Sequence, residues 1–131
     1  MHKITQFLKD AGTFYIATMD GDQPRVRPFG AVAELDGKLY IQTSNQKPVF
    51  QQIMKNPKVE ISGMAGGKWI RFTATLVRDD RREARKAVLD ACPELRQIGY
   101  DEDDGKCEVL YFTDGKADIC SFTEPTESYT L

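Results

Sequence analysis

Two short segments carry the side chains best suited to bind an anion. Arg25 and Arg27 lie two residues apart in PRVRPF, and hydroxyl, amide and ammonium side chains follow one another in TSNQK. Side chains two residues apart point to the same face of a strand, so the two guanidinium groups project together. Guanidinium forks, hydroxyls and an ammonium group are donors that a phosphate requires. The spacing indicates a phosphate site of Arg25, Arg27, Thr43, Ser44 and Lys47.

The two segments are expected to meet through a β-hairpin. We predict a strand from Arg25 to about Leu35, a turn at Asp36-Gly37 and a second strand over KLYIQT. In such a hairpin the start of the first strand lies beside the end of the second. A helix beginning near Gln46 adds backbone N–H donors. Basic residues on a hairpin edge also occur as solvated charges that discourage aggregation, and no strict phosphate-loop pattern is present, so both interpretations stay open.

The remaining reactive side chains indicate neither a metal site nor a histidine-dependent triad. The only histidine is His2, and the three cysteines, Cys92, Cys107 and Cys120, form no CxxC pair. We therefore expect no disulfide framework or zinc site, a reducing cytoplasmic location, and cysteines that are mostly small buried residues. The acidic loop DEDDGK lacks the spacing of a calcium loop, and we expect no metal there.

Mainly β structure with short helices is expected to position these residues. Hydrophobic spacing predicts helices over residues 2–11, 46–56 and 79–91, the last capped by Asp79 or Asp80, and a short helix in PELRQIGY. Besides the hairpin, strands are predicted over TFYIATM, KVEISGM, KWIRFTATLV, Cys107 to Phe112 and ADICSF, with a hairpin turn at Thr113-Lys116 and a polar, frayed tail. About seven strands linked by hairpins predict a small antiparallel barrel.

Length and charge limit the partners. The chain has 131 residues, 40% of them hydrophobic, with a formal net charge of −2. These values predict a single domain over residues 1–131 and give no indication of nucleic-acid binding. No apolar run approaches the roughly 20 residues that span a bilayer, and the N-terminus lacks the features of a secretory signal.

The order of these motifs resembles that of the pyridoxamine 5′-phosphate oxidase-like family, the FMN-binding split barrels. The similarity runs from the first helix to ADICSF. It rests on PRVRPF, on YIQTSNQKPVFQQI, on NPKVEI and on WIRFTATLV, in this order. The resemblance implies a split antiparallel β-barrel that forms a homodimer, with FMN in a cleft at the subunit interface.

The resemblance also implies roles for individual residues. The strand matching Arg25 to Phe29 runs along the flavin, with Arg25 or Arg27 toward the phosphate. The segment matching Gln42 to Lys47 wraps the ribityl phosphate, and the strand matching Trp69 to Arg71 faces the flavin from the other subunit. The implied cofactor-binding residues are Arg25, Val26, Arg27, Pro28, Phe29, Gln42, Thr43, Ser44, Asn45, Lys47, Trp69 and Arg71.

The function implied is an oxidoreductase that reduces a small-molecule acceptor, with a reduced nicotinamide, NAD(P)H, as a possible electron donor. True pyridoxamine phosphate oxidases carry a C-terminal segment with basic and aromatic substrate contacts, whereas TEPTESYTL has no Arg, Lys or His. The chain is more similar to short members of the superfamily, including nitroimidazole-resistance reductases. No residue is assigned as catalytic, and a non-catalytic flavin-binding or flavin-storage protein is the alternative.

Overall fold

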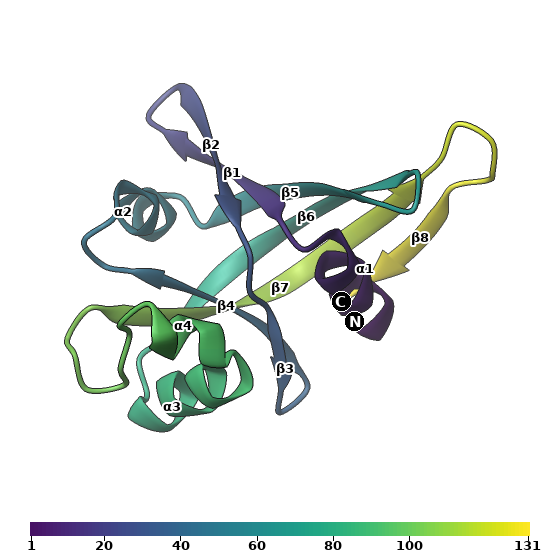
Figure 1. Cartoon of the computed structure of the whole chain (residues 1–131). Coiled ribbons are helices and arrows are strands. Elements are labelled where there is room, and N and C mark those ends of the chain that lie inside the picture. The colour runs from purple at the N-terminus through teal and green to yellow at the C-terminus, as the bar shows by residue number, and fades with distance from the viewer.

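A computed structural model describes all residues from Met1 to Leu131 and contains eight strands and four helices. Figure 1 labels them in chain order. They are α1 (His2–Ala11), β1 (Phe14–Asp20), β2 (Gln23–Phe29), β3 (Ala33–Leu35), β4 (Lys38–Ser44), α2 (Pro48–Lys55), β5 (Lys58–Ala65), β6 (Lys68–Asp79), α3 (Arg82–Ala91), α4 (Pro93–Gln97), β7 (Cys107–Cys120) and β8 (Glu127–Thr130).

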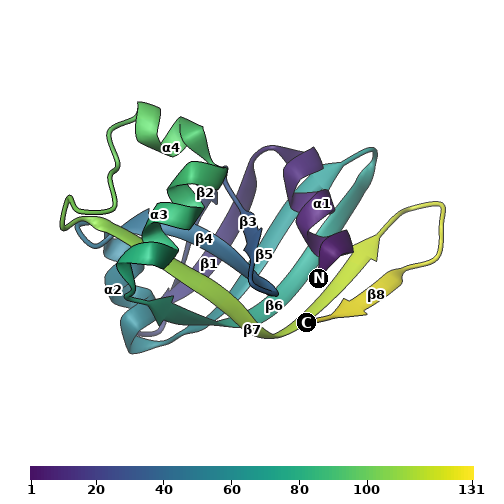
Figure 2. The ribbon, with the colours of Figure 1, turned by 90° about the horizontal axis from the view of Figure 1, so that it is seen from below.

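The strands form one antiparallel sheet whose two ends are joined by a very short connection. The order is β2-β1-β5-β6-β7-β4-β3, with β8 added on β7. Strands β2 and β3 are therefore at opposite ends of the sheet, yet only residues 30–32 separate them in the chain. Four Cα steps span at most about 14 Å, so the sheet must curl until its ends approach each other (Figure 2). This confirms the predicted split antiparallel barrel.

The prediction of one continuous strand from Arg25 to Leu35 is wrong. β2 pairs with β1 over its whole length, with Ile16 opposite Arg27, and only the short β3 forms a hairpin with β4. Pro24 and Pro28 cannot donate a backbone hydrogen bond, and they are tolerated because β2 is an edge strand. The predicted turn at Asp36-Gly37 is confirmed, but its hairpin extends only as far as Ala33 and does not bring β2 beside the end of β4.

Apolar side chains from the inner face of the sheet fill the barrel. The alternation predicted for KWIRFTATLV is confirmed, since Ile70 and Phe72 are fully buried and Arg71 and Thr73 are exposed. A second, smaller cluster lies beneath α3 and α4 and includes Tyr40 and Val88. The helices thus cover the barrel on the side where β4 and β7 pair.

The predicted hairpin turn at Thr113-Lys116 is also wrong. Residues 107–120 form one long strand, β7, which pairs with β6 on both sides of an irregularity near Thr73 and Thr75. Asp114 adopts a positive φ of 53° there, so the turn-like sequence is used as a bulge within the strand.

The tail predicted to be frayed is ordered as β8. It pairs with β7, with Ala117 opposite Tyr129, and the Leu131 N–H donates to the Gly115 carbonyl at 2.9 Å. A Cβ on Gly115 would lie 2.7 Å from side-chain atoms of both Phe72 and Leu131. The absence of a side chain at Gly115 therefore allows the C-terminus to pack onto the barrel.

The helices agree with the sequence apart from their ends. The first helix is confirmed, and the second begins at Pro48, in its first turn. The third begins at Arg82 rather than 79, and neither predicted aspartate is its N-cap residue, which is Arg81. Asp79 is buried and accepts hydrogen bonds from the Tyr40 hydroxyl and the Arg81 guanidinium instead. No helix has the length and apolar character needed to cross a membrane.

Candidate functional site

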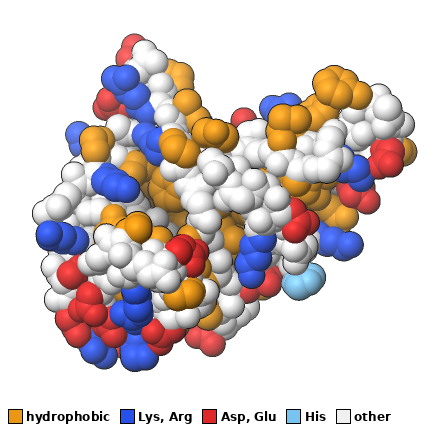
Figure 3. Space-filling view, viewed as in Figure 1, with side chains coloured by type: hydrophobic (Ala, Val, Ile, Leu, Met, Phe, Trp, Pro, Cys, Tyr) orange, Lys and Arg blue, Asp and Glu red, His pale blue; other side chains and the backbone are white.

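A small hollow lies in the split of the barrel, where the end of β2 approaches the end of β4. Its volume is about 180 Å³. We call it the inner hollow, and Figure 3 shows basic side chains around this part of the surface. It is lined by Arg27, Pro28, Phe29, Gly30, Ala31, Gln42, Thr43, Lys47, Val49, Leu95, Ile98 and Tyr100.

Arg27 is held rigidly by neutral groups only. Its Nη1 donates to the Ile16 carbonyl at 3.0 Å and to Thr18 Oγ1 at 2.8 Å, and its Nη2 donates to Gln52 Oε1 at 2.7 Å. Desolvation, and then repulsion from Arg25, lower the pKa of Arg27. No carboxylate compensates its charge, so the guanidinium is a fixed donor that an anion would stabilise.

Thr43 carries the single buried side-chain polar atom that has no hydrogen-bond partner. This atom is Oγ1, and the residue is 2% exposed. A buried hydroxyl without a partner costs about 1–3 kcal/mol, so it requires an explanation. A phosphate bound in the inner hollow would provide one, because a hydroxyl can donate to a phosphate oxygen.

Lys47 completes a cationic end of the inner hollow. It is exposed and takes part in none of the ion pairs of the protein. Arg27, Lys47 and Thr43, whose buried hydroxyl has no partner, thus line one cavity. This donor set fits the phosphate of a nucleotide cofactor.

The side-chain amide nitrogen of Gln42 is already engaged within the protein. Nε2 donates to the Thr43 carbonyl at 2.7 Å and lies 3.8 Å from Cys107 Sγ. Burial raises the pKa of Cys107 to about 11, so the thiol stays protonated near neutral pH. With its nitrogen engaged, Gln42 has its carbonyl oxygen left to accept a hydrogen bond from a ligand.

Half of the residues predicted for the site line the inner hollow. They are Arg27, Pro28, Phe29, Gln42, Thr43 and Lys47. Arg27 reaches Thr43 and Lys47 across the barrel split and not through the predicted hairpin. Which of these side chains contact a cofactor stays a prediction.

The other predicted residues lie elsewhere. Arg25 pairs with Asp20 at 3.3 Å, and Val26 is 68% exposed on the outer face of β2. Ser44 Oγ accepts from the Gln46 N–H, and Asn45 donates to the Gly105 carbonyl and Glu108. Both side chains therefore stabilise the loop before α2.

Trp69 and Arg71 do not line the inner hollow of their own chain. Trp69 is the second residue of β6, and its ring packs on Phe122 with the two ring centroids 4.9 Å apart. Arg71 is exposed on the outer face of the sheet. Their predicted role requires a second subunit.

Sequence reasoning missed Thr18, Gln52 and the wall provided by α4. Gln52 Oε1 accepts from both Arg27 and the Thr18 hydroxyl, the latter at 2.6 Å. Leu95, Ile98 and Tyr100 close the side opposite β2, and Ile98 is 72% exposed. No pattern in the sequence marks these residues, because the contacts of Thr18 and Gln52 and the exposure of Ile98 depend on the tertiary fold.

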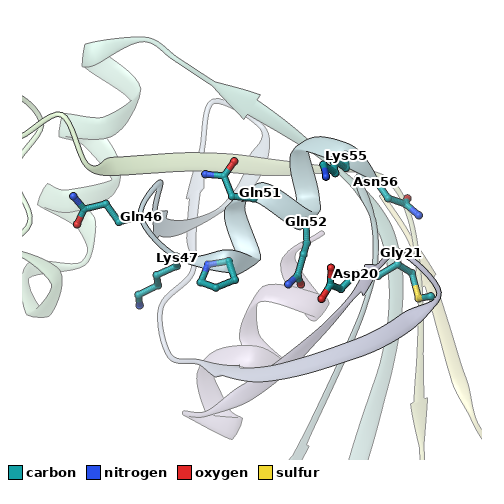
Figure 4. Close-up of a pocket in the computed structure, with 10 residues that line it drawn as sticks. Asp20, Gly21, Gln46, Lys47, Gln51, Gln52, Lys55 and Asn56 are labelled. Carbon is teal, nitrogen blue, oxygen red and sulfur yellow. The ribbon is translucent and has the colours of Figure 1, made fainter.

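A second, larger hollow of about 650 Å³ lies on the other side of Lys47. We call it the outer hollow. Figure 4 shows its labelled residues in and beside α2 and, across from them, Asp20 at the end of β1 and Gly21 in the turn that follows. Its lining consists of Met19, Asp20, Gly21, Gln46, Lys47, Pro48, Gln51, Gln52, Lys55 and Asn56.

The acidic loop and the cysteines have structural surroundings. Glu102 accepts from Arg96 at 2.8 Å, which lowers the pKa of Glu102 to about 2, and Asp103 pairs with Arg82. No group of three or more His, Cys, Asp or Glu side chains is placed to hold a metal ion. Cys92 and Cys107 are buried, as predicted, and Cys120 is half-buried.

Comparisons with known proteins agree with this architecture. The family model described as pyridoxamine 5′-phosphate oxidase matches residues 1–103. A NimC/NimA family protein from Clostridium acetobutylicum is 53% identical, with a TM-score of 0.96, and the match covers 100% of this chain and 93% of that one. A search of curated proteins found no match.

More distant solved structures share the fold. A pyridoxamine 5′-phosphate oxidase-related, FMN-binding protein from Nostoc punctiforme is 14% identical, with a TM-score of 0.65 over 99% of this chain and 95% of that one. A heme-binding protein from Mycobacterium smegmatis is 15% identical, with a TM-score of 0.70 over 95% of this chain and 55% of that one. From the family match and the close NimC/NimA relative, we conclude that the chain belongs to the pyridoxamine 5′-phosphate oxidase family.

Proposed function

We propose that this protein is an FMN-binding flavoprotein that acts as an oxidoreductase on a small-molecule acceptor. The observation that carries the proposal is the fixed Arg27 guanidinium, which has only neutral partners. Arg27 lines the same hollow as Lys47 and as Thr43, whose hydroxyl has no partner. These donors suit the FMN phosphate. The FMN-binding relative from Nostoc punctiforme, which shares the fold, supports the same ligand.

The residues of the inner hollow suggest that the redox chemistry would reside in the flavin. Its titratable side chains are Arg27, Lys47 and Tyr100, without a carboxylate, histidine or thiol. A bound flavin would accept two electrons as hydride from a reduced nicotinamide and pass them to the acceptor, while the protein binds and orients it. A flavin-binding protein without turnover is the alternative, and a nicotinamide oxidation assay separates the two.

Flavin is favoured over a histidine-ligated haem. A relative of the same fold from Mycobacterium smegmatis binds heme. In this chain the sole histidine, His2, lies beside Glu34 at the start of α1, and neither residue lines the inner hollow. The inner hollow therefore offers no imidazole ligand.

We further propose that the functional unit is a homodimer. A hollow of about 180 Å³ is smaller than the roughly 300–1,000 Å³ of typical ligand pockets, so the flavin ring needs a second surface. The outer face of the sheet exposes Tyr15, Val26 and Met64, at 48%, 68% and 65%. Phe122 is 89% exposed on the arm formed by the ends of β7 and β8, where Figure 3 shows hydrophobic atoms. Such exposed apolar groups are typical of subunit contacts, and Trp69 and Arg71 would reach the partner's flavin from this face.

The test is the visible spectrum of the purified protein after incubation with excess FMN and removal of unbound ligand. We expect retained flavin bands at about one FMN per subunit, and a sedimentation coefficient of a dimer. Protein that stays colourless in excess FMN would exclude a flavoprotein. A flavin-loaded monomer would exclude only the dimer.

A further inference from the structure

Two of the four amide side chains that line the outer hollow, Gln52 and Asn56, present donors because their oxygens are already engaged, whereas Gln51 donates to the Asn45 carbonyl and keeps its oxygen as an acceptor. Gln52 Oε1 accepts from Arg27 and Thr18, so the amide nitrogen of Gln52 is left without a protein partner. Asn56 Oδ1 accepts from the Lys58 N–H, which leaves the Asn56 nitrogen free in the same way. Both nitrogens can only donate.

The charges of the outer hollow favour an anion as well. Lys47 and Lys55 line it, and neither is in an ion pair. The only carboxylate is Asp20, and Arg25 already neutralises it at 3.3 Å. Two unpaired ammonium groups and two donor-only amides thus surround a volume of about 650 Å³.

The two hollows meet at the cationic end of the inner one. Lys47 lines both, and the 2.7 Å hydrogen bond from Arg27 to Gln52 joins a residue of one wall to a residue of the other. A phosphate held by Arg27 and Lys47 would therefore lie at the boundary, and a ligand that continues beyond this phosphate would enter the outer hollow. The volume is within the range for a ligand of nucleotide size.

We infer that the outer hollow is a nucleotide-phosphate site that takes an adenylate group. This deepens the proposed function and rests on it for the position of the first phosphate. The adenylate has two possible sources with the same chemistry. It is either the half of FAD that extends beyond the FMN unit, or a separate nucleotide such as the adenylate half of a nicotinamide donor. No covalent step is involved.

The test uses Lys55→Gln, which changes a residue of the outer hollow only, and Lys58→Gln as the matched control. Lys58 is exposed, has no ion pair and does not line either hollow. Dissociation constants for FMN, FAD and ADP are measured by calorimetry, with ADP titrated into both ligand-free and FMN-saturated protein. Thermal unfolding confirms that both variants fold.

If the adenylate belongs to FAD, we expect FAD to bind more tightly than FMN. Lys55→Gln should then weaken FAD binding about tenfold, because one charge-assisted hydrogen bond is lost. If it belongs to a separate nucleotide, ADP binds FMN-saturated protein with the same dependence on Lys55. In both cases Lys55→Gln leaves the FMN affinity unchanged, and Lys58→Gln leaves the affinities for FMN, FAD and ADP unchanged.

Equal FMN and FAD affinities together with no ADP binding would overturn the inference while leaving the flavin site intact. An equal loss in Lys55→Gln and Lys58→Gln would also overturn it, because general electrostatics would then explain the effect. A protein that binds ADP through Lys55 but no flavin would refute the proposed function and retain the nucleotide site.

Discussion

Replacing Arg27 with methionine is the most direct test of the phosphate end of the inner hollow. The substitution removes the charge and the donors but keeps an unbranched apolar stem. In the ligand-free protein Arg27 donates to Thr18, to Gln52 and to the backbone carbonyls of Ile16 and Arg25. The Thr18–Gln52 hydrogen bond at 2.6 Å survives its loss, so we expect a cost of only about 1–2 kcal/mol in unfolding free energy.

The effect on the ligand is larger and specific for the phosphate. Loss of a charge-assisted hydrogen bond costs about 1.5–3 kcal/mol, which corresponds to about 10- to 150-fold weaker FMN binding. Riboflavin has the same ring and ribityl chain without the phosphate, so its affinity should change less than twofold.

The assay is a titration that follows the quenching of flavin fluorescence, for FMN and riboflavin in parallel. Arg25→Met is the matched control, because Arg25 lies on the same face of β2 but pairs with Asp20 and is outside the inner hollow. Equal losses for the two ligands, or equal losses in the two variants, would refute the assignment of Arg27 to the phosphate.

Three further predictions concern other parts of the molecule. Thr43→Val removes the unpartnered hydroxyl, so it should raise the unfolding free energy by about 1 kcal/mol yet weaken FMN relative to riboflavin; no gain in urea denaturation would contradict this. Val26→Glu places a charge on the exposed outer face of β2 and should shift sedimentation toward the monomer, whereas Gln23→Glu on the other face should not. The hydrogen bond from Arg81 is the main cause of the lowered pKa of Asp79. The stability that Asp79 contributes is therefore present above its unfolded pKa of about 3.9 and is lost as the pH falls below that value. Asp79→Asn should flatten this acid decline of the unfolding free energy in urea denaturation, and parallel curves for the two proteins would contradict the prediction.

The sequence was sufficient for features set by local pattern. Alternating apolar residues predicted β6, and Pro48 in its first turn predicted α2, because both signals act over a few residues. The site residues in PRVRPF and TSNQK were found from donor chemistry and from family resemblance. These signals do not require knowledge of which strands pair.

Features that depend on distant contacts could not be predicted. The separation of β2 from β3 follows from closure of the whole sheet, which no local residue encodes. The segment Thr113-Lys116 has the residues of a turn, but pairing with β6 keeps it within β7. The sequence of the polar tail carries no strand pattern, and the tail is ordered because Leu131 packs against Gly115. Gln52 becomes part of the site only through its hydrogen bond with Arg27, which lies 25 residues earlier in the chain.

The short connection at residues 30–32 has a consequence for the kinetics of folding. It joins the two ends of the sheet, so β2 and β4 face each other only after β1 has paired with β5 and β4 with β7. These pairings are distant in sequence and are expected to form slowly. We therefore expect the walls of the inner hollow to reach their final positions late in folding, too late for a ligand to guide it. Excess FMN should slow unfolding and leave the refolding rate unchanged, because the ligand stabilises contacts that form after the transition state.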